Sequence, residues 1–282
     1  MGPPTEEPRT MMRLKQTALI FLALLTLTAG APYPAPAADV APLVDQGWLL
    51  GGFSQGKWLS PQETAKALKG GEPYQLCTLT RFLGRAQGAK PRSNPHIEVG
   101  PDFAITFTPA PQTREPVVAV GGTWPAMPRQ PRRLTTNLEP YADAAREILQ
   151  SKGIAHPQIN LTQVIEIDLD GDGVKEVLVS ATRFTMPHLS DLLKDGDYSM
   201  VFLWKKVQGA VRHILIAGQF KSPGQPDPGL ATILRLAGLV DANGDGVMEI
   251  VVNYKYYEGG GMRVYQLKGD TVDEVLAEDW GA

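Results

Sequence analysis

The sequence has few cysteines, few histidines and little net charge. Cys77 is the only cysteine among the 282 residues, which excludes an internal disulfide. The four histidines (His96, His156, His188 and His213) are scattered and lack the spacing of zinc ligands. A formal net charge of −3 favours neither nucleic acid nor an anionic membrane as a partner. These scarcities exclude disulfide scaffolds and disfavour zinc sites and polyanion binding.

The N-terminal apolar run, residues 17–28, is too short to span a bilayer. Arg13 and Lys15 precede it, and Ala35-Pro36-Ala37 follows as a small-residue cleavage site. We therefore expect residues 1–37 to be a signal peptide, and the mature protein to be secreted or periplasmic without stable membrane insertion. An uncleaved membrane anchor is the alternative. An exported chain without disulfides needs another source of stability, and a bound metal ion is one candidate.

Residues 38–135 are predicted to form a β-rich N-terminal region with one short helix. Ser60 and Glu63 form a capping box with a proline at the first helical position, so a helix is expected from Pro61 to Lys69. Strands are expected at 74–80, 103–108 and 116–121, with Cys77 as a buried apolar residue. The segment 124–133 is rich in Pro and Arg, which predicts an exposed connection. Its Arg129, Arg132 and Arg133 are expected either to be solvated or to meet an acidic partner.

Residues 136–282 are predicted to form one helix followed by two β repeats. Apolar residues between Tyr141 and Leu149 recur with helical spacing. The repeats, 160–220 and 231–282, are each expected to be a four-strand antiparallel meander that resembles a propeller blade. The expected strands are 161–168, 176–184, 198–207 and 210–220, then 232–240, 249–257, 262–268 and 272–277. The fold class is thus α+β, mostly β, with two blade-like meanders, a small β-rich N-terminal part and two helices.

Each repeat carries an acidic loop between its first two strands. The loops begin at Asp168 and Asp241, and they share the same residue at positions 1, 4, 5, 6, 7, 9 and 12. Oxygen-bearing residues stand at positions 1, 3, 5 and 9, and position 7 offers a carbonyl oxygen, which is the ligand chemistry that calcium prefers. The expected calcium ligands are Asp168, Asp170, Asp172, Val174 and Glu176 in the first loop, and Asp241, Asn243, Asp245, Val247 and Glu249 in the second.

A DxDGDGxxE loop between two strands resembles the FG-GAP or VCBS-type repeat of integrin α-subunit propellers and of many secreted bacterial proteins. The resemblance covers about the last 120 residues and implies calcium at both loops, with the ligands named above. Two features depart from the family pattern: only two repeats are present, and position 9 is Glu instead of Asp. An EF-hand is excluded, because Val179 and Val252 stand where its position-12 glutamate is required and strands follow both loops.

Several alternatives stay open on the sequence alone. The loops can be metal-free β-turns, since Asp and Gly favour turns. Gly52-Phe53-Ser54-Gln55-Gly56 matches the nucleophile elbow of α/β-hydrolases, but the helix begins too late for an elbow and a hairpin turn is expected. The predicted function is an exported, non-catalytic, calcium-binding structural or binding module with an unknown protein or glycan ligand. A secreted hydrolase and a cell-surface adhesion module are the alternatives.

The two loops differ in charge. The first has four carboxylates and the second three, because Asn243 replaces an aspartate. Since ligand charge is one of the terms that tune calcium affinity, the first loop is expected to bind more tightly.

Overall fold

The chain folds mainly into antiparallel strands, with two helices, as the sequence predicts. The computed structural model describes residues 1–2, 40–95, 100–186, 188–226 and 229–281. The predicted signal peptide lies outside these residues except for Met1 and Gly2. In the described part of the chain, no helix is long and apolar enough to cross a membrane.

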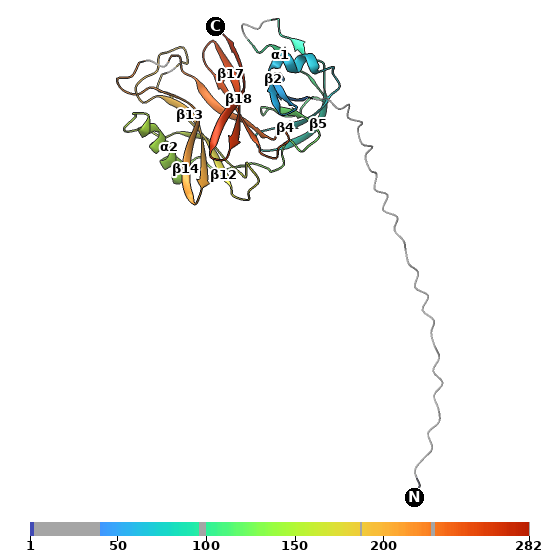
Figure 1. Ribbon diagram of the computed structural model, residues 1–282. Coiled ribbons are helices and arrows are strands. Elements are labelled where there is room, and N and C mark those ends of the chain that lie inside the picture. Colours follow the sequence, from blue (N-terminus) through green and yellow to red (C-terminus); the bar gives the residue numbers. More distant parts are fainter. Residues whose placement is uncertain (3–39, 96–99, 187, 227–228, 282) are drawn as a thin grey trace. The chain divides into compact units, whose positions relative to one another are not determined.

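Residues 41–121 form a nine-stranded sheet, called here the N-terminal sheet (Figure 1). Eight strands lie in the order β6-β7-β2-β1-β9-β4-β5-β8, and β3 pairs with β2. The strands are β1 (Ala41–Asp45), β2 (Trp48–Ser54), β3 (Lys57–Leu59), β4 (Pro73–Cys77), β5 (Phe82–Gly88), β6 (Arg92–Ser93), β7 (Phe103–Ala104), β8 (Phe107–Thr108) and β9 (Val118–Gly121).

The two predicted repeats form two separate antiparallel sheets. The first repeat sheet contains β10 (Arg132–Arg133), β11 (Leu161–Ile167), β12 (Glu176–Arg183), β13 (Tyr198–Val207) and β14 (Ala210–Phe220), in that order. The second repeat sheet contains β15 (Ile233–Val240), β16 (Glu249–Lys255), β17 (Gly259–Lys268) and β18 (Thr271–Gly281). Each is a meander, and β10 is an extra strand added to the edge of the first.

The second repeat sheet is buried on both faces. Val252 belongs to a core shared with Ile165 and Leu178 of the first repeat sheet. The adjacent Val251 belongs to a second core, shared with Leu43 and Val118 of the N-terminal sheet. Because successive side chains of a strand point to opposite faces, the second repeat sheet packs between the other two.

The two helices cover the remaining faces. Helix α1 (Pro61–Ala67) has the predicted capping box and lies beside β2, while α2 (Glu139–Ser151) lies beside β14 (Figure 1). Helix α2 buries its predicted apolar face, including Ile148 and Leu149, against the first repeat sheet. The order of layers is therefore α2, first repeat sheet, second repeat sheet, N-terminal sheet and α1.

The glycine run at the start of β17 differs from the prediction. Residues 259–261 fall between two expected strands, 249–257 and 262–268, but they pair in the sheet with β16 and β18. Aromatic side chains of neighbouring strands lie over these glycines: a Cβ atom at Gly261 would meet the Tyr254 ring at 2.3 Å. The absence of a side chain thus makes room for an aromatic residue on the next strand, and no turn is needed to explain it.

Candidate metal centre

The two acidic loops have the same internal hydrogen bonding. Loop 1 (residues 168–176) joins β11 to β12, and loop 2 (residues 241–249) joins β15 to β16. The first carboxylate, Asp168 or Asp241, accepts hydrogen bonds from the N–H groups three and five positions later. These bonds measure 2.7 and 3.2 Å in loop 1 and 2.7 and 3.0 Å in loop 2. Glycines at positions 4 and 6 adopt φ values between 78° and 85°, which few other residues tolerate.

The acidic residue at position 9 closes each loop from the start of the following strand. Oε2 of Glu176 accepts from the N–H of Leu169 at 2.9 Å, and Oε2 of Glu249 accepts from the N–H of Ala242 at 2.7 Å. Both glutamates are fully buried. In both repeats, position 9 thus returns to its own loop.

Three acidic residues of loop 1 can hold a metal ion. Asp168, Asp170 and Glu176 each offer an oxygen, and these oxygens lie within 4.8 Å of one another. Asp172 accepts from the N–H of Val174 at 2.7 Å, so it bonds within the loop. In loop 2, Asp245 accepts from Val247 N–H at 2.8 Å in the same way. It remains a prediction that the carbonyl oxygens of Val174 and Val247 are ligands. The identity of the ion and the number of sites are predictions as well.

A lysine ammonium lies among the carboxylates of loop 1. Lys205 Nζ donates to Asp170 Oδ2 at 2.7 Å and to Glu176 Oε1 at 2.8 Å, and the lysine is only 6% exposed. Burial alone would raise the pKa of Asp170 and lower that of Lys205. The two hydrogen bonds outweigh burial, so the pKa of Asp170 lies below its ordinary value and that of Lys205 above it. Glu176 is buried so deeply that its pKa is raised despite the lysine.

Loop 2 has amides where loop 1 has an ammonium. Asn243 Nδ2 donates to Glu249 Oε1 and to Asp245 Oδ2, both at 3.0 Å, and Gln266 Nε2 donates to Asp245 Oδ2 at 3.1 Å. Within the described residues, no cationic side chain pairs with Glu249. Burial, reinforced by the charges of Asp245 and Asp241, raises the pKa of Glu249 to about 9. Loop 2 therefore holds a buried acidic group that pairs with no cationic side chain among the described residues.

Part of segment 124–133, which was predicted to be an exposed connection, donates hydrogen bonds to both loops. Arg129 donates to the carbonyl oxygens of Asp168 and Leu169 in loop 1 and, at 2.6 Å, to that of Gly246 in loop 2. Trp124 Nε1 donates to the carbonyl of Asp241 at 2.8 Å. We call residues 124–129 the bridging segment. The sequence prediction was wrong for this part of 124–133. Arg132, by contrast, is exposed and pairs with Glu166 of its own chain at 3.0 Å.

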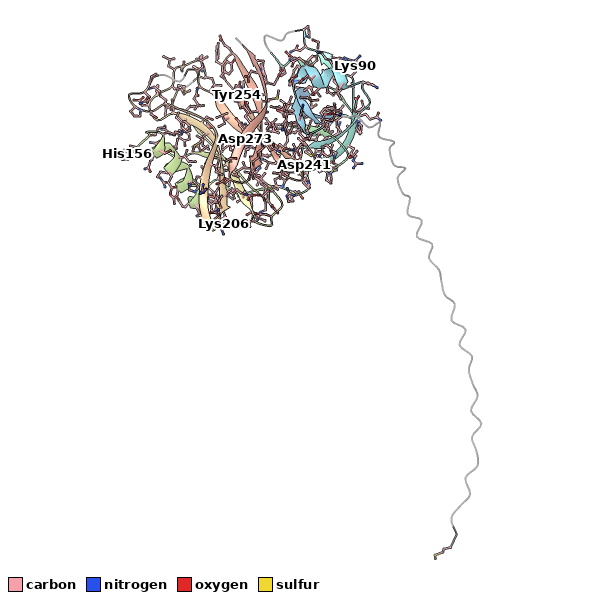
Figure 2. All side chains as sticks on the ribbon, viewed as in Figure 1. Lys90, His156, Lys206, Asp241, Tyr254 and Asp273 are labelled. Carbon is pink, nitrogen blue, oxygen red and sulfur yellow. The ribbon has the colours of Figure 1, made fainter. Side chains whose placement is uncertain are left out.

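The loops also bond to each other directly. Met248 N–H donates to the carbonyl of Leu169 at 2.9 Å. Asp241, labelled in Figure 2, donates from its own N–H to the carbonyl of Ala126 in the bridging segment. The two candidate ion sites thus share main-chain contacts.

The other motifs have structural surroundings in the described residues. Ser54 ends β2, and a turn at Gln55 and Gly56, both with positive φ, leads straight into β3, so the hairpin expected in place of a nucleophile elbow is confirmed. Cys77 is fully buried in β4, as predicted, and burial raises the pKa of its thiol to about 12. His213 contacts Glu147 at 3.0 Å, and His96 lies outside the described residues.

Comparison with protein-family models, with curated proteins and with solved structures finds no match. The resemblance to FG-GAP or VCBS-type repeats therefore remains a prediction that depends on the two loops. Sequence reasoning missed Lys205, Gln266, Trp124 and Arg129 as residues of the site. Correct pairing of the strands would have revealed Lys205 and Gln266, because each lies directly across from the position-9 glutamate of its repeat. Nothing local in the sequence marks the other two.

Proposed function

We propose that this protein is an exported, non-catalytic module in which calcium bound at the acidic loops stabilises the packing of three β-sheets. The observation that carries the proposal is the buried Glu249, which closes loop 2 without a cationic partner in the described residues. A buried carboxylate near two further acids must either take up a proton or meet a positive ion. Calcium is the hard, oxygen-seeking ion that such a ligand set suits.

The position of the loops explains why an ion would act on the whole fold. The bridging segment follows the N-terminal sheet in the chain and bonds to both loops. An ion that orders a loop also orders the carbonyl groups to which Arg129 and Trp124 donate. Calcium binding is therefore expected to stabilise the contact between the repeats and the N-terminal sheet, which suits a structural or binding module.

Thermal unfolding with calcium and with a chelator tests the proposal. An ion that binds only the folded state adds RT ln(1 + [L]/Kd), about 2.7 kcal/mol at a hundredfold excess over Kd. We expect the wild type to melt at a higher temperature in calcium, and Asp241→Ala to lose much of that response. Asp273→Ala, which removes an exposed acid of β18, is the matched control and should keep the response. Identical wild-type melting curves with and without calcium would show that the loops are plain turns.

A further inference from the structure

Lys205 and Gln266 occupy the same place in the two repeats. In the first repeat sheet Val177 pairs with Trp204, so the next pair outward is Glu176 with Lys205. In the second, Ile250 pairs with Tyr265, so the next pair is Glu249 with Gln266. The residue across from the position-9 glutamate is therefore a cation in one repeat and a neutral amide in the other.

The ammonium of Lys205 is aimed at the oxygens that an ion in loop 1 would need. It bonds to the carboxylates of positions 3 and 9, Asp170 and Glu176, at 2.7 and 2.8 Å. The lysine side chain is 7% exposed, so it is held in the loop and not in solvent. A divalent cation on the same two carboxylates would face repulsion from the ammonium, or would have to displace it from a buried ion pair.

Lys205 also cancels the difference in charge between the loops. The four candidate ligand carboxylates of loop 1 have a formal charge of −4, and Lys205 brings the sum to −4 + 1 = −3. The three candidate ligand carboxylates of loop 2 also have a formal charge of −3, and the side chains that bond to Asp245 and Glu249 among the described residues are the amides of Asn243 and Gln266. With Lys205 counted, the formal charge of the ligand carboxylates therefore gives loop 1 no advantage over loop 2 in calcium affinity.

We propose that Lys205 is a built-in cation that takes the place of a metal ion in loop 1, so that calcium fills loop 2 first and loop 1 only weakly or not at all. The inference rests on the proposed calcium-binding function and specifies it. Loop 1 is then held together by Lys205 of β13, and loop 2 is the part of the fold that responds to calcium. Gln266, which can turn its amide oxygen toward an ion, is compatible with binding where Lys205 is not.

Exchanging the two residues tests the inference. Calcium titration calorimetry on the full chain should give one binding event for the wild type, assigned to loop 2 if Asp245→Asn abolishes it and Asp172→Asn does not. Lys205→Gln should add a second event or tighten the weak one at least tenfold. Gln266→Lys should weaken the wild-type event at least tenfold. Lys206→Gln, which makes the same change on the exposed neighbour, is the control and should match the wild type.

The possible results distinguish a failure of the inference about Lys205 from a failure of the proposed calcium-binding function. If the wild type binds calcium but neither exchange changes the number of sites or the affinity, Lys205 does not control occupancy and the inference is wrong. If Asp172→Asn and not Asp245→Asn abolishes binding, loop 1 is the calcium site and the inference is again wrong. If neither the wild type nor any variant binds calcium, the proposed function fails with it. Because Gln266→Lys leaves loop 1 intact, it decides the question even if Lys205→Gln folds poorly.

Discussion

Asn253 donates a hydrogen bond from its side-chain amide to Asp45 Oδ2 at 2.6 Å, which links β16 of the second repeat sheet to β1 of the N-terminal sheet. Asp45 is fully buried, and burial raises its pKa from the ordinary value to about 6. The second oxygen of Asp45 and the amide oxygen of Asn253 are buried and have no hydrogen-bond partner among the described residues. Protonation of Asp45 therefore removes a buried negative charge that its neighbours compensate poorly.

We predict that Asp45 makes the protein less stable as the pH rises from 4 to 7. The folded state keeps the proton up to about pH 6, whereas an unfolded aspartate loses it near pH 3.9. The stability that the proton contributes is complete below pH ~4 and is lost as pH rises through about 6. Asp45→Asn should remove this loss and be more stable than wild type by up to roughly 3 kcal/mol at pH 7.

Urea unfolding at fixed calcium concentration and several pH values measures this effect. The difference between wild type and Asp45→Asn should shrink toward pH 4, where both side chains are neutral. Asp143→Asn, on the exposed face of α2, serves as the control and should show no such trend. An equal difference at pH 4 and pH 7 would contradict the prediction.

Arg129→Ala is expected to destabilise the protein by roughly 3 kcal/mol or more. The substitution removes a charged donor from three carbonyl groups, of which that of Leu169 belongs to a fully buried residue. Arg133→Ala removes the same charge from an exposed position of β10 and should change stability by less than about 0.5 kcal/mol. Urea unfolding compares the two. Equal losses would mean that the bridging segment does not hold the loops.

The contact between β15 and β9 can be tested with a glycine. A Cβ atom at Gly238 would lie 2.6 Å from Val118 Cγ2, so Gly238→Ala is expected to destabilise the protein by about 1–3 kcal/mol through overpacking. In the Val118→Ala background the same substitution should be less harmful, because the clashing methyl group is gone. A double-mutant cycle measures the coupling energy. A coupling of zero would show that these two strands do not pack closely.

Cys77 is expected to react with thiol reagents only when the protein unfolds. Its thiol is fully buried and its pKa is raised to about 12 by burial, so almost no thiolate forms at pH 8. Labelling in buffer should be slow, and labelling in urea should be rapid and complete. Rapid labelling of the folded protein would place Cys77 at the surface instead of in the core behind the N-terminal sheet.

The repeat strands were predictable because their signals are local. Apolar residues of β13 and β16 alternate or run continuously, and turn residues bound each strand. The helix at Tyr141–Leu149 was visible in the same way. The N-terminal sheet was harder to predict, because many of its strands have only two to five residues and β1 pairs with β9, far along the chain. Local patterns do not contain that pairing.

The residues of the candidate site differ in the same way in how well the sequence predicts them. The ligands of each loop lie within nine consecutive residues, so a motif finds them. Lys205 reaches Glu176 from 29 residues away, and Arg129 reaches Gly246 from 117 residues away. Such neighbours follow only from the register of β13 against β12 and from the path of the bridging segment, which are properties of the folded chain.

The bridging segment also has a consequence for how the chain reaches its folded state. Trp124 and Arg129 each bond to a carbonyl group 117 positions later in the sequence. The bridging segment can therefore not obtain its full set of contacts until loop 2 has been synthesised and has folded. Chains dominated by such distant contacts fold slowly and expose unpaired strands while they wait. During that interval the second repeat sheet is not yet present to cover the apolar face of the N-terminal sheet. The uncovered face leaves the chain open to aggregation and proteolysis.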